Sequence, residues 1–360
     1  MLDKRFGDVA MPIIETCNLT EEKRTKKMVQ ENISSALFNA IKDALEKEEQ
    51  VILFQNRRGY APVLTCNVCA WVPKCKNCDI SLTYHKFIDS LKCHYCGYTQ
   101  KLPNTCGACG STHLTLKGVG TEKIEDELHR LLPLARIARL DLDAVKTKFG
   151  HEKIIRSFEE KQFDILVGTQ MLSKGLDFEH VSLVGVINAD ALLAFPDFRA
   201  HERAFQLLLQ VSGRAGRKHQ QGKVIIQSST PNHFVLQAVI HHQYEALLER
   251  ELDERQKYAY PPYFRLIKII LKHKDYQLVD RAAAHLKEIF LQKGKIILLG
   301  PESPHVGRIR NQYLKEMLIK IKRNDSDLVA VKQHIARSME LLKEDKLFRS
   351  VTVYADVDPV

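Results

Sequence analysis

Eight of the nine cysteines lie between residues 66 and 109, in four pairs whose members are separated by two residues. A gap of two residues lets both sulfurs of a pair turn toward one ion, as a tetrahedral Zn²⁺ site requires. Gly97 and Gly110 follow the last two pairs, where a left-handed turn is easiest without a Cβ. With four thiolates to an ion, this pattern predicts two structural zinc sites.

The spacing between the pairs favours a nested arrangement of the two sites. Only five residues separate Cys69 from Cys75, which is short for two knuckles on one ion, whereas fourteen separate Cys78 from Cys93. A crossed arrangement would also supply four thiolates to each ion. In the nested arrangement the inner site is Cys75, Cys78, Cys93 and Cys96, and the outer site is Cys66, Cys69, Cys106 and Cys109.

A disulfide framework is the alternative to metal binding. No signal peptide is recognised at the start of the sequence, and paired thiols in a reducing compartment hold metal more often than they form disulfides. Because eight thiolates fill two sites, His85, His94 and His113 are expected at the surface. Cys17 stands alone and is expected to be a packing residue.

The composition allows two or three folded domains and argues against a membrane protein. The 360 residues are 44% hydrophobic, and no apolar run approaches the length of a membrane-spanning helix. Lysine and arginine outnumber aspartate and glutamate by 54 to 44, a formal charge of +10. This excess favours a polyanionic partner, nucleic acid first, although charge alone decides little.

Around the cysteines, the hydrophobic pattern predicts one α/β lobe. Ser34 or Ser35 can cap a helix that ends near Leu45. Buried strands are expected at 51–54, 135–140, 164–169, 181–187 and 222–228, and helices around 124–132, 154–158, 205–209 and 233–252. Alternating apolar strands and helices imply a parallel sheet covered on both faces. The cysteines follow the first strand, so they are expected to form an insertion into this lobe.

Two further segments flank the lobe. Residues 1–33 are polar, with a nearly continuous basic run from Lys23 to Lys27, and are expected to be a solvated arm. Tyr260-Pro-Pro262 is expected to be a linker, and the βαββαβ pattern beyond it indicates a ferredoxin-like α+β domain. The expected domains are the arm (1–33), the lobe (34–64 with 118–255), the zinc-binding insertion (65–117) and the C-terminal domain (256–360).

One loop of the lobe, residues 168–177, follows the carboxyl end of a buried strand, where open parallel sheets bind their ligands. Gly168 and Gly175 would allow a ligand to approach the backbone closely, and Thr169 offers a hydroxyl group to a phosphate.

A second loop, residues 210–217, places Arg214 and Arg217 three residues apart. Two such arginines suit the γ-phosphate of a nucleotide, where they can offset the charge that develops in phosphoryl transfer. Either arginine alone is explained by solvation near a helix end. Together, at the ends of neighbouring strands, the two loops predict a nucleotide site.

These segments resemble motifs of superfamily 2 helicases: Arg57-Arg-Gly, 168–178 and 210–217 are similar to motifs IV, V and VI. With eight cysteines between motifs IV and V, the sequence resembles the PriA family of replication-restart helicases over most of its length. The resemblance implies a RecA-like second helicase lobe with nested zinc sites. It also implies an ATP-dependent 3′→5′ DNA helicase that recognises stalled or recombined forks and restarts replication by primosome assembly.

The resemblance implies roles for residues at the matching positions. The residues that would face ATP between two motor lobes, with the arginines as catalytic groups, are Gly175, Asp177, Gln210, Arg214 and Arg217. Arg57, Arg58 and Thr169 would lie toward DNA. The implied partners are forked and single-stranded DNA, single-stranded DNA-binding protein and other primosome proteins. A cytoplasmic, nucleoid-associated monomer without membrane contact is expected.

The sequence departs from this family in one respect. No Gly-x-x-x-x-Gly-Lys-Ser/Thr loop occurs, so ATP and Mg²⁺ are expected only together with a first motor lobe. Asp126-Glu-Leu-His129 mimics the acidic box of that lobe but lies in an amphipathic helix, where it is expected to be helix surface. The chain looks like a C-terminal fragment or a truncated product, inactive as an ATPase by itself.

A non-enzymatic zinc module that binds DNA and docks partner proteins is the alternative function. Trp71, Tyr84, Tyr95 and Tyr98 lie among lysines, which would suit stacking on unpaired bases. Packing around the metal knuckles explains each aromatic residue alone. A metabolic enzyme is not favoured, because the sequence offers no Ser/His/Asp arrangement and no open three-ligand metal site.

Overall fold

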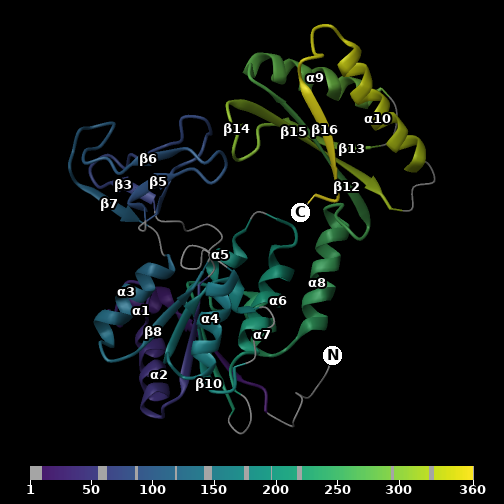
Figure 1. The fold of residues 1–360 in the computed structure, drawn as a ribbon. Helices are drawn as coiled ribbons and strands as arrows, with labels where there is room; N and C mark the ends of the chain where they lie inside the picture. Colours follow the sequence, from purple (N-terminus) through teal and green to yellow (C-terminus); the bar gives the residue numbers. More distant parts are fainter. Residues whose placement is uncertain are drawn as a thin grey trace. The chain divides into compact units, whose positions relative to one another are not determined.

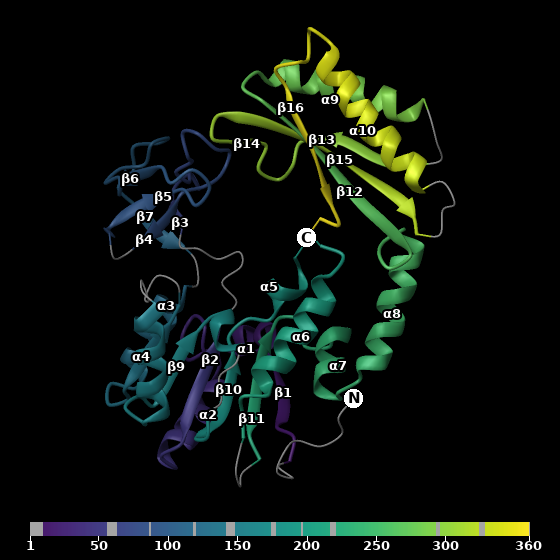
Figure 2. The ribbon, with the colours of Figure 1, turned by 45° about the vertical axis from the view of Figure 1, so that its right-hand side comes forward.

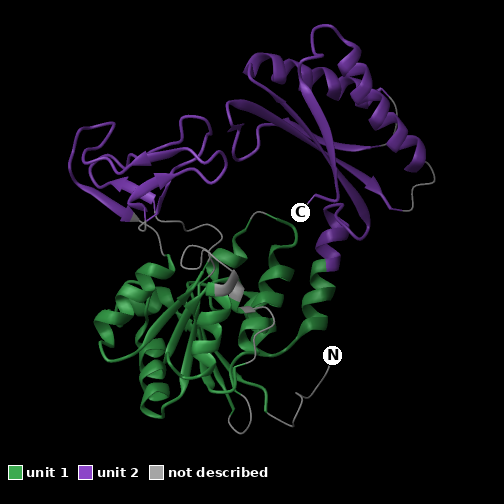
Figure 3. Cartoon of the chain, viewed as in Figure 1, with its two compact units in different colours: residues 1–61, 118–251 green, residues 62–117, 252–360 purple. Residues whose placement is uncertain are grey.

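The chain divides into two compact units in the computed structural model (Figure 3): residues 1–61 with 118–251, and residues 62–117 with 252–360. The described residues are 10–55, 63–85, 88–117, 120–141, 148–173, 178–195, 197–216, 221–292, 296–323 and 328–359. The zinc-binding insertion and the C-terminal domain, expected as separate domains, share the second unit. Among the described residues, no helix is long and apolar enough to cross a membrane.

A six-stranded parallel sheet forms the centre of the first unit (Figures 1 and 2). Its strand order is β1 (Ile13–Asn18), β11 (Lys223–Ser228), β10 (Val181–Val186), β2 (Gln50–Phe54), β9 (Ile165–Gly168) and β8 (Ile137–Leu140). Strand β2 precedes the cysteines in the sequence and pairs in parallel with β9 and β10, which follow them. The prediction that the cysteines interrupt a single lobe is confirmed.

Helices cover both faces of this sheet because its strands are apolar on both sides. Along β2, Ile52 and Phe54 pack into one core and Val51 and Leu53 into the other. Helices α2 (Ser35–Glu46) and α3 (Thr121–Leu131) contribute to the second core. The first core receives residues from α4 (Lys148–Glu159), α5 (Asp190–Leu193), α6 (Ala200–Ser212), α7 (Phe234–Ile240) and α8 (Tyr244–Lys257). The RecA-like parallel architecture is as predicted.

Local capping explains where two helical segments begin and end. The Ser34 hydroxyl accepts a hydrogen bond from the Leu37 N–H at 3.2 Å, which caps α2 as predicted. The single long helix expected over 233–252 is two helices, α7 and α8. The chain turns between them at His242, whose φ of 53° is left-handed and ends the first helix.

The N-terminal segment differs from the predicted solvated arm. Strand β1 pairs in parallel with β11 at the edge of the sheet, and Asn18 then caps the short helix α1 (Leu19–Arg24). Burial raises the pKa of Cys17, which packs in the core. Few residues of this segment are buried, so its apolar signal is too short to reveal an edge strand.

Two buried polar side chains anchor the end of this segment to the lobe. The Gln227 side chain accepts the Ser34 N–H and donates to the carbonyls of Asn32 and Ile187, all at 2.9 Å. Glu127 accepts hydrogen bonds from the backbone and the side chain of Asn32, at 3.2 and 2.6 Å. Its burial raises its pKa, although these bonds oppose the rise. The segment 126–129 is helical as predicted, but Glu127 is core rather than surface.

Asp190, at the start of α5, is a carboxylate that supports the lobe. It accepts hydrogen bonds from the Ser228 hydroxyl at 2.5 Å and the Ser229 N–H at 2.9 Å. Burial alone would raise its pKa, but these bonds outweigh burial and hold the pKa below its usual value. A carboxyl group whose pKa is lower in the folded than in the unfolded protein stabilises the fold at pH values above its unfolded pKa, which is near 3.9. This stabilisation is lost as the pH falls through the pKa of the folded state.

Asp190→Asn is therefore expected to lower the free energy of unfolding at pH 7 by about 1–3 kcal/mol. It should also weaken the dependence of stability on pH below about 4, because the titrating group is gone. Urea unfolding between pH 3 and pH 7 measures both effects. Asp126→Asn, at an exposed position of α3, is the control and should change stability by less than about 0.5 kcal/mol. Equal stability of the Asp190→Asn variant and the parent at pH 7 would contradict this role.

Two small sheets and one larger sheet build the second unit (Figure 1). In the insertion, β3 (Val63–Cys66) pairs with β7 (Leu114–Lys117), and β4 (Thr83–His85), β5 (Ser90–Lys92) and β6 (Thr99–Lys101) form an antiparallel sheet. The C-terminal sheet has the order β13 (Ile297–Glu302), β15 (Gln312–Lys322), β12 (Phe264–His273) and β16 (Thr352–Val357), and β14 (Arg308–Ile309) pairs with β15. Its core is closed by α9 (Tyr276–Leu291) and α10 (Leu328–Glu344). The predicted ferredoxin-like order is confirmed.

Candidate metal centres and nucleotide site

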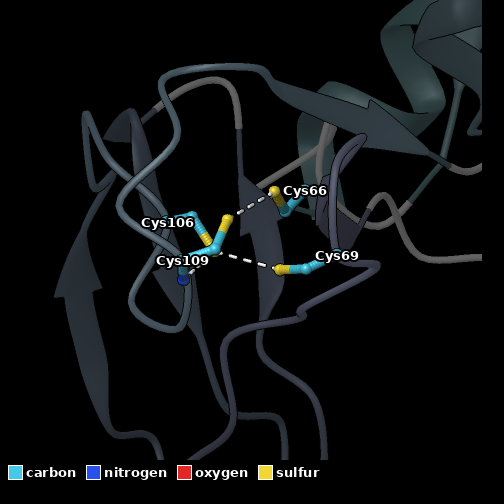
Figure 4. A group of neighbouring side chains, drawn as sticks. All are labelled: Cys66, Cys69, Cys106 and Cys109. Carbon is cyan, nitrogen blue, oxygen red and sulfur yellow. Dashed lines mark hydrogen bonds between the residues drawn. The ribbon is translucent and has the colours of Figure 1, made fainter.

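The eight paired cysteines form two four-sulfur clusters, grouped in the nested way. In the outer cluster, the Sγ atoms of Cys66 and Cys109 lie 3.7 Å apart and those of Cys69 and Cys106 lie 3.5 Å apart (Figure 4). In the inner cluster, which also contains Cys78 and Cys93, the Sγ atoms of Cys75 and Cys96 are separated by 3.5 Å.

These distances fit zinc rather than disulfide bonds. Four sulfurs placed 2.3 Å from the centre of a tetrahedron lie about 3.8 Å apart, whereas disulfide sulfurs are separated by about 2.05 Å. All the cysteines are free thiols, and within each cluster the four sulfurs lie within 4.8 Å of one another. Two Cys₄ clusters of this size are consistent with two Zn²⁺ sites, in which the protein supplies all four ligands and leaves no position open for catalysis.

Backbone N–H groups favour the thiolate form that zinc requires. Ala108 and Cys109 donate to the Cys106 sulfur at 3.4 Å, and Asn77 donates to the Cys75 sulfur at 3.4 Å. Burial alone would raise the pKa of Cys106, but the bonds from Cys109 and Ala108 outweigh it and lower the pKa to about 6. Hydrogen bonds to the charged form have this effect in general.

The two clusters differ in exposure. Cys69 and Cys109 of the outer cluster are exposed, whereas Cys75, Cys78 and Cys93 of the inner cluster are buried. The inner sulfurs belong to the small core of the insertion, together with Leu64, Leu82 and Leu91. The inner site therefore also organises the packing of the insertion.

The loop that begins at Gly168 lies at the carboxyl edge of the sheet. Thr169 directly follows β9 and is buried. A Cβ on Gly168 would lie 2.6 Å from the Leu172 side chain and 2.9 Å from the Leu140 carbonyl oxygen. Packing within the lobe therefore requires a glycine at this position, and the approach of a ligand to its backbone stays a prediction.

The second loop, residues 210–217 (the arginine loop), lies at the opposite edge of the sheet in its described part, residues 210–216. Gln210 is exposed on the last turn of α6, and Arg214 is half-buried just beyond that helix. Gly216, with a φ of 72°, donates its N–H at 2.9 Å to the carbonyl of Val181, the first residue of β10. The arginine loop thus meets the amino end of β10, whereas Thr169 stands at the carboxyl end of β9 and these strands run parallel. Arg57, Arg58, Gly175, Asp177 and Arg217 lie outside the described residues.

Three family models match the chain. They are the PriA DNA helicase Cys-rich region (CRR) domain over residues 75–101, the helicase conserved C-terminal domain over 119–219, and the primosomal protein N C-terminal domain over 256–360. The chain corresponds to the C-terminal region of the PriA replication restart proteins. The matched regions follow the same order as the zinc insertion, the parallel lobe and the C-terminal domain.

Several PriA replication restart proteins align with almost the whole chain. The Bacillus subtilis protein is 39% identical over 99% of this chain and 44% of its own length. The Synechocystis protein is 38% identical over 89% of this chain and 39% of its own length. The Haemophilus influenzae protein is 36% identical over 92% of this chain and 45% of its own length. The chain spans less than half the length of these three PriA relatives. Among solved structures, the C-terminal domain of the DEAD-box protein Dbp5 matches the chain at 12% sequence identity and a TM-score of 0.30. The match covers 69% of this chain and 97% of the Dbp5 domain.

Packing accounts for most of the aromatic residues around the clusters of this PriA region. Trp71 covers Gly107 of an outer knuckle, where a Cβ would lie 2.7 Å from the indole ring. Tyr84 and Tyr98 are partly buried against the inner-cluster core. Tyr95 is 43% exposed and is the member of the set most open to stacking. His85, His94 and His113 join neither four-sulfur cluster.

Sequence reasoning missed a contribution from the C-terminal domain. In the β14–β15 turn, the Arg310 N–H donates to the Cys78 sulfur of the inner cluster, and the Asn311 N–H donates to the carbonyl of the neighbouring Asn77. No local motif in the Pro/Gly-rich segment before β15 predicts these bonds. Arg310 and Asn311 form a two-residue connection typical of a tight hairpin, but this connection is recognisable only once the two-residue strand β14 is assigned in the structure.

Proposed function

We propose that this chain forms the second motor lobe, the zinc module and the C-terminal domain of an ATP-dependent 3′→5′ DNA helicase. The helicase would recognise stalled or recombined forks and restart replication by primosome assembly. The observation that carries the proposal is the order of the matched regions, with two Cys₄ clusters inserted into a parallel lobe that matches the helicase C-terminal domain. Forked DNA, single-stranded DNA-binding protein and other primosome proteins are the proposed partners.

A division of these loop residues between ATP and DNA fits this function. The arginine loop, with Gln210, Arg214 and Arg217, would face ATP together with Gly175 and Asp177. The two guanidinium groups would stabilise the charge that develops on the transferred phosphate. Arg57, Arg58 and Thr169 would face DNA. The placement of Thr169 and Arg214 at opposite edges of the sheet supports a division between a DNA side and a nucleotide side.

The purified 360-residue chain is expected to show no DNA-stimulated ATP hydrolysis. Its sequence contains no Gly-x-x-x-x-Gly-Lys-Ser/Thr loop, so it lacks the lysine and hydroxyl groups with which that motif holds the phosphates and Mg²⁺. Phosphate release with and without forked DNA measures this, with a complete PriA protein as the positive control. DNA-stimulated turnover by the chain alone would contradict the assignment of a single motor lobe.

A zinc-dependent DNA-binding and docking module is the second candidate, favoured by the net charge of +10 and the exposed Tyr95. The chain is expected to bind forked DNA with an affinity that falls steeply with salt, because bound lysines and arginines release counterions. Contact with about five phosphates of a single strand gives a slope of about −3.5 in log K against log salt. Fluorescence anisotropy between 50 and 200 mM salt measures the slope, and a flat response would show that the positive charge serves another purpose.

A further inference from the structure

One knuckle of the inner site is closed differently from the other three. In the pairs that begin at Cys66, Cys93 and Cys106, the residue after the second cysteine has a left-handed φ and donates its N–H to the carbonyl of the first cysteine. These residues are Ala70, Gly97 and Gly110, with φ of 57°, 78° and 72° and N···O distances of 2.9, 3.0 and 3.0 Å. Asp79 holds the equivalent position in the fourth knuckle. Its N–H instead donates at 2.9 Å to the carbonyl of Arg308 in the C-terminal domain.

The partner of this knuckle is the β14–β15 hairpin, residues 308–312, which docks its tip onto the inner cluster. The two tip residues, Arg310 and Asn311, have φ of 50° and 59°. Such turns favour asparagine followed by glycine, so an arginine in the first position is unfavourable by itself. The Arg310 N–H donates to the Cys78 sulfur at 3.3 Å, and its guanidinium Nε donates to the Tyr95 carbonyl at 3.3 Å. These contacts hold the tip in a conformation that the residue does not prefer.

A second chain of hydrogen bonds runs through two asparagines. The Asn311 N–H donates to the Asn77 carbonyl at 2.8 Å, and its side-chain amide donates to the Asn77 side-chain oxygen at 3.4 Å. The Asn77 amide nitrogen in turn lies 3.8 Å from the Cys96 sulfur. The hairpin therefore contacts the Cys78 sulfur directly and is linked to the Cys96 sulfur through the Asn77 side chain.

An ion pair and an apolar contact complete the junction. Arg308 Nε lies 3.1 Å from Asp79 Oδ1, and Ile309 packs against the core that contains Cys75, Cys78 and Cys93. In the described part of the chain, no hydrogen bond from the C-terminal domain reaches the four outer cysteines.

We propose that the β14–β15 hairpin is a clasp that positions the ligands of the inner zinc, so that this ion ties the zinc module to the C-terminal domain. Donors to zinc-bound thiolates offset their negative charge and fix their orientation, and loss of such partners typically weakens metal binding 10- to 100-fold. The inner ion is therefore retained through residues more than 200 positions away in the sequence, whereas the exposed outer ion is not. The proposal rests on the zinc sites and is independent of helicase activity.

Zinc release from the full 360-residue chain tests the clasp. With excess 4-(2-pyridylazo)resorcinol, we expect a fast phase from the outer site and a slow phase from the inner site. Cys69→Ser, which removes an outer ligand, should abolish only the fast phase. The double variant Arg308→Gln/Asn311→Gly removes the ion pair with Asp79 and the hydrogen bond from the Asn311 side chain to the Asn77 side chain. Glycine suits the second position of this turn. Because these contacts hold the tip that carries the Arg310 N–H to the Cys78 sulfur, their loss should accelerate the slow phase at least about tenfold and leave the fast phase unchanged.

Arg337→Gln is the matched control, because it removes an exposed, ion-paired guanidinium of the same domain from α10. It should alter neither phase. An unchanged slow phase in the double variant, or equal acceleration of both phases, would overturn the clasp.

Hydrogen exchange on the unsubstituted chain tests the reciprocal effect without any substitution. Removal of zinc should increase exchange at the amides of Arg310 and Asn311, while the amide of Ile269 in the centre of the C-terminal sheet stays protected. Unchanged exchange at the hairpin tip after zinc removal would also overturn the proposal.

Discussion

Replacing Cys78 with serine is expected to remove one of the two zinc equivalents and to unfold the zinc module while the parallel lobe stays folded. The core of the insertion consists of three leucines and the buried inner cysteines, which is too little apolar surface to hold so small a module without metal. Structural zinc contributes about 10–16 kcal/mol to the folding of isolated zinc fingers. Loss of one of the four thiolate ligands of the inner site should therefore remove most of the stabilisation that the ion gives to the zinc module. Metal analysis and limited proteolysis of residues 63–117 measure the two effects.

Cys17→Ser is the matched control for this substitution. Cys17 is a buried thiol in β1 and lies outside both clusters, so its loss removes a sulfur without removing a ligand. This variant should keep two zinc equivalents and an intact insertion. Two zinc equivalents in the Cys78→Ser variant would contradict the inner site, and a loss in the Cys17→Ser variant would show that metal content follows general unfolding.

Replacing Arg217 with alanine in a longer protein that carries the phosphate-binding loop is expected to abolish ATP hydrolysis and to spare DNA binding. An arginine that stabilises the transferred phosphate is worth on the order of 10³- to 10⁵-fold in kcat. DNA binding should persist because the arginine loop meets the amino edge of β10, away from Thr169 at the carboxyl edge of β9. Steady-state hydrolysis and fork-binding anisotropy on the same preparation separate the two functions.

Arg156→Ala provides the control for charge removal in the same lobe. Arg156 lies on α4 with 81% of its side chain exposed and pairs with Glu160, so its loss should leave hydrolysis unchanged. Hydrolysis that survives in the Arg217→Ala variant would remove Arg217 from the catalytic role. Equal loss of hydrolysis and DNA binding would indicate that the arginine supports the fold of the lobe instead.

Much of the fold was accessible from local patterns. The apolar runs predict every strand of the parallel sheet except β1, because a strand buried on both faces has a strong and continuous signal. Strand β1 buries little and lies at an edge, so its mixed sequence resembles a solvated arm. The break at His242 was likewise hidden, because one left-handed residue can end a helix within an otherwise helical pattern.

The motifs of the candidate nucleotide site did not show where its loops lie in the lobe. Thr169 directly follows β9 and Arg214 lies just beyond α6, but neither motif reveals which edge of the sheet its loop meets. The hydrogen bond from Gly216 to Val181 assigns the arginine loop to the amino edge of β10. Gly168 is small because Leu172 and the Leu140 carbonyl fill the space beside it, a constraint set by packing between separate elements.

By itself, the sequence determined the metal chemistry, the α/β class of the lobe and the ferredoxin-like order of the C-terminal domain. These properties depend on spacings of two to about fourteen residues, over which the backbone geometry is nearly fixed. Only the tertiary structure decided that Glu127 is core, that the two loops of the lobe meet opposite edges, and that Arg308–Asn311 close a knuckle beside Cys78. Each of these features depends on contacts between segments that are far apart in the sequence. A local hydrophobic pattern does not predict which distant groups pair with a buried hydrogen-bond donor or acceptor.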